Sequence, residues 1–94
     1  MQVRHPGPID AARAAEWWSK AARLGHPEAQ AMLGAAYLSG QGVIRDPVEA
    51  LHWLLRAEMG GAGELAAGFL REARAHTRVS QRAEAHRRAE RPLP

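Results

Sequence analysis

The chain has 94 residues, of which 46% are hydrophobic, and it carries a net charge of +3. This length allows one small domain, and the apolar content excludes a wholly disordered chain. The absence of cysteine excludes disulfides and Cys-ligated zinc. No apolar run resembles a signal peptide or membrane span, so we expect a soluble, cytoplasmic protein that does not bind membranes.

The positive charge is concentrated at the C-terminal end. Residues 1–70 carry six basic and seven acidic groups, whereas residues 71–94 carry seven arginines and three glutamates. Lys20 is the only lysine beside twelve arginines, a bias that is typical of GC-rich bacterial genomes. The basic character therefore belongs to the tail rather than to the body of the domain.

Four helices are predicted after an irregular lead-in at residues 1–9. Asp10 is a good N-cap for a helix over residues 11–24, which Gly25 can end in a left-handed conformation. Pro27 favours the first turn of a second helix over residues 27–39. These two helices and the two that follow define a domain over residues 10–76.

The third and fourth helices are predicted from similar signals. Asp46 as cap, Pro47 at the first helical position and Glu49 two residues later predict a helix over residues 47–59, with Glu49 completing a capping box. A glycine-rich turn at residues 60–63 precedes a fourth helix over residues 64–76. In the basic tail, residues 77–94, helix-forming residues continue while the apolar stripe fades, which predicts either a solvated helical extension or disorder.

The segment around Trp18 is repeated around Trp53, 35 residues later. Four identities carry the repeat: Ala15, Trp18, Ala22 and Gly25 recur as Ala50, Trp53, Ala57 and Gly60. A period of this length with helical spacing is typical of helix-pair repeat arrays. Such arrays present surfaces to partners, so we expect a binding protein.

Three consecutive motifs make the resemblance specific. They are LG-x-x-Y from Leu33, G-x-GV from Gly40 and D-x-x-EA-x-x-W from Asp46. In this combination the chain closely resembles the Sel-one-like repeat family, a relative of the tetratricopeptide repeats, over about residues 10–70. The resemblance implies an all-α solenoid of about two repeats, with four helices in two antiparallel pairs. It also implies a scaffold or adaptor role in protein–protein interaction.

The spacing of these motifs also has a physical interpretation. Gly34 permits a close helix crossing, Trp18, Tyr37 and Trp53 fill the space between helices, and the glycines at 40 and 42 allow positive φ. The fourth helix departs from the pattern, since Phe69, Leu70 and Ala73 stand where Leu33, Gly34 and Tyr37 would recur. So short an array rarely buries enough surface alone, which predicts self-association, docking on a partner, or membership of a longer array.

Carried over from the tetratricopeptide repeats, the concave face predicts a groove for a partner segment of mixed polarity. The residues that would line it come from the second and fourth helices: Glu28, Ala31, Ala35, Leu38, Glu64, Ala67, Arg71 and Arg74. The alternative is an ordinary solvated helix face.

Trp17 is the strongest candidate for a single binding residue. Its counterpart in the repeat is His52, so the position does not require an apolar side chain, and a tryptophan here could be an interface hot spot. The alternative is that Trp17 packs under residues 6–8 and covers the open N-terminal end.

Arg74, Arg78 and Arg82 recur every four residues and, on one continuous helix, would form a basic ridge. Such a ridge could contact phosphate or an acidic partner, which makes nucleic-acid binding an alternative function. The tail lacks aromatic residues for base stacking, and Glu72, Glu84 and Glu90 reduce its charge. Nucleic-acid binding is therefore the less favoured interpretation, and a solvated face the simplest one.

Neither metal binding nor catalysis is predicted. No two of the five histidines have the spacing of a helical ligand pair, so we interpret them as surface residues. Ser19, Ser39, Ser80 and Thr77 lie in no nucleophile motif. We expect no cofactor, no metal and no enzymatic activity.

Overall fold

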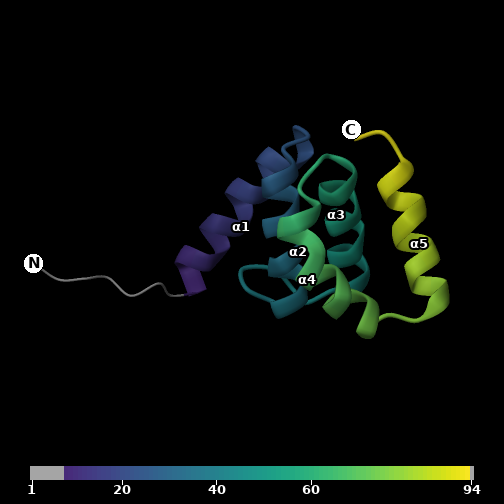
Figure 1. Cartoon of the computed structure of the whole chain (residues 1–94). Coiled ribbons are helices and arrows are strands. Elements are labelled where there is room, and N and C mark those ends of the chain that lie inside the picture. The colour runs from purple at the N-terminus through teal and green to yellow at the C-terminus, as the bar shows by residue number, and fades with distance from the viewer. Residues whose placement is uncertain (1–7, 94) are drawn as a thin grey trace, which may run out of the picture.

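The computed structural model describes residues 8–93, and within this range it contains five helices and no strand (Figure 1). The all-α helical-repeat prediction is confirmed. The helices are α1 (Pro8–Arg23), α2 (Pro27–Ser39), α3 (Pro47–Met59), α4 (Gly63–Ala75) and α5 (Val79–Glu90).

Local signals explain where these helices begin and end. Helix α1 begins at Pro8, so Asp10 lies in its first turn rather than at its N-cap. Asp46 does cap α3, because its Oδ1 accepts hydrogen bonds of 3.1 Å from the backbone N–H groups of Val48 and Glu49. Glu49 does not close a capping box, since the Asp46 N–H is already donated to the carbonyl of Tyr37.

Helix α2 lies between α1 and α3, and it approaches α3 closely at Gly34. A Cβ added at Gly34 would come within 2.6 Å of Leu54 Cγ and 3.1 Å of the Ala50 carbonyl oxygen. The main core cluster continues from this crossing through the inner faces of α3, α4 and α5 and includes the fully buried Leu51 and Leu54. The predicted close approach at Gly34 is therefore present.

The two repeat-equivalent tryptophans belong to a second, smaller cluster. Trp53 is buried there with Ala22 and Leu33, while Trp18 packs against the cluster and stays half-buried. Tyr37 touches both clusters and joins them. The predicted role of these aromatic residues in filling space between helices is what the packing shows.

The basic tail is neither a free extension nor disordered over residues 79–90. The chain reverses after α4, and α5 packs along α3 (Figure 1) with Ala85 and Ala89 buried against it. Helix α4 ends at Ala75, and the Thr77 hydroxyl donates to the carbonyls of Ala73 and Arg74 at that end of the helix. Gln81 then caps α5 by accepting the N–H of Arg78.

Candidate functional site

A hollow of about 260 Å³ lies between α2 and α4 on the face where these two helices run beside each other. We name it the α2–α4 groove. Its walls are mostly apolar, with one acidic group: Trp18, Met32, Ala35, Ala36, Ser39, Gln41, Phe69 and Glu72.

The face of α2 that borders this groove carries Met32, Ala35 and Ser39, with the exposed Glu28 one turn earlier. Of the α2 residues predicted to line the groove, Glu28 and Ala35 are on this face. Ala31 and Leu38 are not: they are 0% and 5% exposed in the core cluster. That part of the prediction is wrong, because the side of α2 that carries these two residues packs against α3.

Helix α4 contributes Phe69 and Glu72 to the groove, and Leu65, one turn before Phe69, is 44% exposed on the same side. The four residues predicted from α4 are exposed but absent from the groove walls: Glu64, Ala67, Arg71 and Arg74. Ala67 and Arg71 each lie two positions from Phe69, which places them on roughly the opposite side of the helix. The pattern of four-residue spacing from Leu65 to Phe69 was the signal that could have found the correct face.

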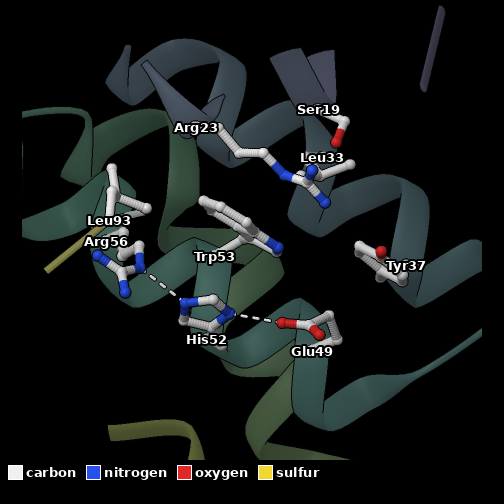
Figure 2. A pocket seen from close by; sticks show the side chains of 9 residues that line it. All are labelled: Ser19, Arg23, Leu33, Tyr37, Glu49, His52, Trp53, Arg56 and Leu93. Carbon is white, nitrogen blue, oxygen red and sulfur yellow. Dashed lines mark hydrogen bonds and ion pairs between the residues drawn. The ribbon is translucent and has the colours of Figure 1, made fainter. Parts of the chain in front are cut away.

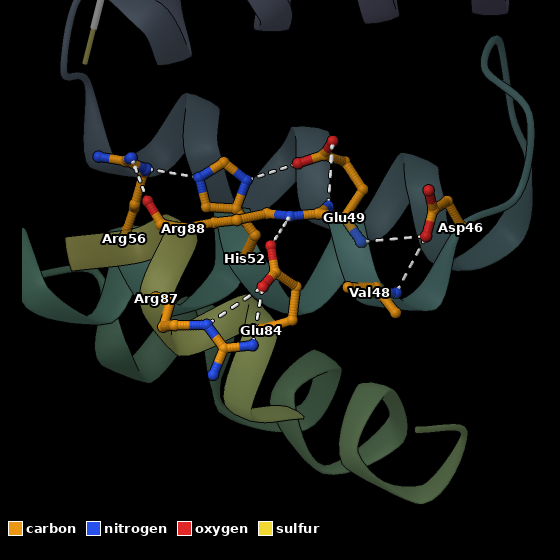
Figure 3. Close-up of polar contacts among 8 residues, drawn as sticks. All are labelled: Asp46, Val48, Glu49, His52, Arg56, Glu84, Arg87 and Arg88. Carbon is orange, nitrogen blue, oxygen red and sulfur yellow. Dashed lines mark hydrogen bonds and ion pairs between the residues drawn. The ribbon is translucent and has the colours of Figure 1, made fainter. Parts of the chain in front are cut away.

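A polar cluster lies on α3 where α5 crosses it (Figure 3). His52 Nδ1 is 2.5 Å from Glu49 Oε1, and Arg56 Nε is 2.6 Å from His52 Nε2. Since arginine can only donate, His52 Nε2 accepts and the ring proton lies on Nδ1, from which it is donated to Glu49. His52 is 8% exposed, so the prediction of a surface histidine is wrong; α5, which the sequence did not place here, covers it.

Arg56 continues this cluster onto α5. Its Nη2 donates at 2.6 Å to the carbonyl of Arg88, which also accepts the Arg91 N–H, and at 2.8 Å to the carbonyl of Arg91, at the C-terminal end of that helix. Arg88 in turn lies 3.7 Å from Glu49. The cluster therefore fastens α5 to α3, and Arg56 blocks the His52 nitrogen that a general base would need.

Acid is expected to weaken this attachment through Glu49. The hydrogen bond from His52 has the largest effect and, together with the charges of Arg88 and Arg23, holds the pKa of Glu49 below its ordinary value of 4.5 against the opposing effect of burial. The folded carboxylate thus binds a proton less readily than the unfolded one, so this stabilisation is present above pH 4.5 and is lost as the pH falls through the folded pKa.

The free energy of unfolding, measured with denaturant between neutral pH and pH 3, tests the contribution of Glu49. Glu49→Gln should flatten the acid-dependent loss of stability, whereas Glu58→Gln, on an exposed position of the same helix, should leave it as in the wild type. An acid profile of Glu49→Gln that matched the wild type would show that this carboxylate is not the group responsible.

The predicted arginine ridge does not form. Arg74 is in the last turn of α4, Arg78 precedes α5, and Arg82 Nη1 donates to the carbonyls of Arg74 and Thr77. Two further tail arginines, at 87 and 88, are paired with Glu84. The break between α4 and α5 is the physical reason, since the helix axis changes direction between Arg74 and Arg82.

Trp17 is 73% exposed, and Lys20 lies over its ring at 5.9 Å from the centroid. This contrasts with its repeat counterpart His52, which α5 covers. The interpretation in which Trp17 packs under residues 6–8 falls mainly outside the described residues. An exposed tryptophan of this kind keeps the hot-spot hypothesis open as a proposal.

Comparison with known families identifies the repeat. The Sel1 repeat matches residues 5–26 and 27–61, more than half of the chain. The chain belongs to the Sel1 repeat family. The second match spans α2, α3 and the loop between them, and the first match spans the whole of α1. No curated protein and no solved structure matches the sequence.

Sel1 repeats generally mediate protein–protein interaction, and the family is typically a non-catalytic scaffold. Between residues 8 and 93, no three histidine, aspartate or glutamate side chains gather as a metal site would require. No helix in that range is long and apolar enough to cross a membrane.

Proposed function

We propose that this Sel1 repeat protein is an interaction module that holds a short segment of another protein in the α2–α4 groove. The observation that carries the proposal is the groove itself, a mostly apolar hollow whose α2 wall lies within the second Sel1 match. A module of this kind acts passively, because a rigid surface built on packed helices fixes the position of its partner.

The walls of the groove indicate the chemistry of the segment. Met32 and Phe69 are half-buried and offer apolar surface, and Leu65 extends that surface along α4. Methionine adapts to differently shaped side chains, so the groove favours one or two apolar anchors rather than a single fixed residue. The hollow is small, which suits a few side chains of a short segment rather than a folded domain.

The charged residues beside the groove indicate which charge a partner segment would carry. Glu72 is the one charged residue in the groove wall, and the exposed Glu28 lies on the α2 face that borders it. Neither glutamate has an ion pair among the described residues. A partner segment that places a lysine or arginine next to its apolar anchors would therefore match both surface and charge.

Substitution of Ala35 tests the proposal. Peptides are first selected on the wild-type chain from a random displayed library, and their affinities are then measured for two variants by calorimetry. Ala35→Arg places a large, positively charged side chain in the groove and should weaken binding at least tenfold, which corresponds to about 1.4 kcal/mol.

Ala67→Arg is the matched control, because it makes the same change on the exposed face of α4 away from the groove. It should bind the selected peptides as the wild type does, and both variants should unfold at similar denaturant concentrations. Peptides that bind Ala35→Arg as tightly as the wild type would place their site elsewhere and overturn the proposal.

A further inference from the structure

A second cavity, of about 380 Å³, is lined by residues of α1, α2 and α3 and by Leu93 (Figure 2). We name it the α1–α3 cavity. Its walls combine aromatic, aliphatic and charged groups: Ser19, Arg23, Leu33, Tyr37, Glu49, His52, Trp53, Arg56 and Leu93. The α2–α4 groove shares none of these residues, so the cavity is a separate feature of the fold.

Hydrogen-bond donors that the fold does not use face this cavity. Arg23 makes no hydrogen bond or ion pair with any described residue, and its guanidinium lies over the cavity beside Leu33 in Figure 2. The indole N–H of Trp53 has no hydrogen-bond partner either. Among residues 8–93, every fully buried side-chain polar atom has a hydrogen-bond partner, so this N–H cannot be fully buried. That N–H therefore keeps open surface, and it points to the side of the cavity where Arg23 and Tyr37 lie (Figure 2).

Tyr37 supplies a further donor. Burial raises the pKa of Tyr37, and the nearby charge of Glu49 raises it more, so the hydroxyl keeps its proton at neutral pH. The acidic group in the wall is already engaged, because Glu49 accepts from His52 and lies 3.7 Å from Arg88. The charges of Arg23 and Arg56 therefore leave the cavity with a positive excess.

The remaining surface is apolar and shaped by aromatic and aliphatic side chains. Leu33 and Trp53 belong to the buried second cluster, and Leu93, after the end of α5, packs against that cluster at the cavity edge. Cavities that bind small molecules have volumes of roughly 300–1,000 Å³ and combine apolar walls with a few directed polar groups. The volume here is at the small end of that range, which limits the occupant to one compact group.

From these observations we propose that the α1–α3 cavity binds a carboxylate that carries a small branched or flat apolar group. The carboxylate is held by Arg23, with the Trp53 N–H and the Tyr37 hydroxyl as additional donors, and the apolar group lies against Leu33 and Leu93. Arginine suits this role because its planar fork matches the two oxygens of a carboxylate. The same chemistry is offered by a free organic acid and by the last residue of a peptide chain.

Nuclear magnetic resonance on the full-length, ¹⁵N-labelled chain tests the proposal. The three tryptophans each give a separate indole N–H signal, and only Trp53 lies in the cavity wall. Titration with 3-methylbutanoate should shift the Trp53 signal at millimolar concentrations and leave that of the exposed Trp17 in place. The neutral 3-methylbutanamide should bind at least tenfold more weakly, as expected for loss of about 1.4 kcal/mol.

Substitution of Arg23 separates binding from folding. Arg23→Gln changes an exposed residue and should weaken 3-methylbutanoate binding at least tenfold, again about 1.4 kcal/mol. Arg13→Gln removes the same charge from an exposed position of α1 outside the cavity and should bind as the wild type does. Arg23→Lys, which keeps the charge without the fork, should fall between the two.

Two further probes identify the source of the carboxylate. The peptide Ala-Ala-Leu with a free carboxyl end is compared with its amidated form and with 3-methylbutanoate. Tighter binding of the peptide with the free carboxyl end than of 3-methylbutanoate would assign the cavity to a chain terminus. Tighter binding of 3-methylbutanoate would assign it to a free organic acid. The proposal is overturned if the Trp53 signal stays in place with every carboxylate, if inorganic phosphate shifts it equally well, or if Arg23→Gln binds unchanged.

Discussion

Replacing Gly34 with alanine should lower the free energy of unfolding by up to about 2 kcal/mol, because overpacking a well-filled core usually costs about 1–3 kcal/mol. The added Cβ would lie 2.6 Å from Leu54 Cγ and 3.1 Å from the backbone oxygen of Ala50. Leu54 is fully buried, so it has little room to move away. The cost should exceed the gain of about 1 kcal/mol that alanine offers over glycine within a helix.

Gly68→Ala provides the matched control in α4. The nearest atom to a Cβ at Gly68 is the end of the Arg71 side chain at 3.8 Å, an ordinary contact. This substitution should therefore stabilise the protein by up to about 1 kcal/mol. Urea unfolding of both variants would measure the two effects, and equal or same-signed changes would contradict the close crossing of α2 and α3.

Replacing Ala85 with glutamate should detach α5 and cost about 2–4 kcal/mol, because it forces a charged group against a buried site. Ala85 is 0% exposed where α5 meets α3. A helix of 12 residues is marginal in water when it stands alone, so detachment should also reduce the helical circular-dichroism signal. His52, now covered by α5, should become accessible to diethyl pyrocarbonate.

Ala83→Glu makes the same chemical change on the exposed face of α5, two positions earlier. It should alter the free energy of unfolding by no more than about 0.5 kcal/mol and leave the helical signal intact. If Ala85→Glu behaved like this control, α5 would not be an integral part of the fold, and the polar cluster on α3 would need another explanation.

The position of α5 is the part of the fold that the sequence predicted least well. Its residues have strong helical propensity, but its apolar contribution to the core is limited to alanines, which give a weak periodic signal. What attaches it is a set of contacts distant in sequence, between Arg56 and the carbonyls of Arg88 and Arg91. By contrast, the helix pair of α2 and α3 follows from local signals at Pro27, Gly34 and Asp46.

The α2–α4 groove and the α1–α3 cavity also differ in how far the sequence predicts them. The sequence predicted that a groove lies between the second and fourth helices, but it assigned several residues from the wrong faces of these helices. The family resemblance indicates which helices are adjacent, but not how each helix is rotated about its axis. The four-residue spacing of Leu65 and Phe69 would have identified the correct face of α4. The α1–α3 cavity depends on Arg23, Trp53 and Leu93, which come from three distant segments, and no sequence pattern joins them.

The measurement that tests the central proposal most directly is a chemical-shift map of a selected peptide on the full-length chain. If the groove binds the partner segment, the largest backbone shifts should fall on Met32, Ala35 and Ser39 of α2 and on Phe69 and Glu72 of α4. Helix α5 and the α1–α3 cavity should be little affected. Shifts concentrated on the arginines of α5, and removed by moderate salt, would contradict the account and favour an electrostatic partner of that helix.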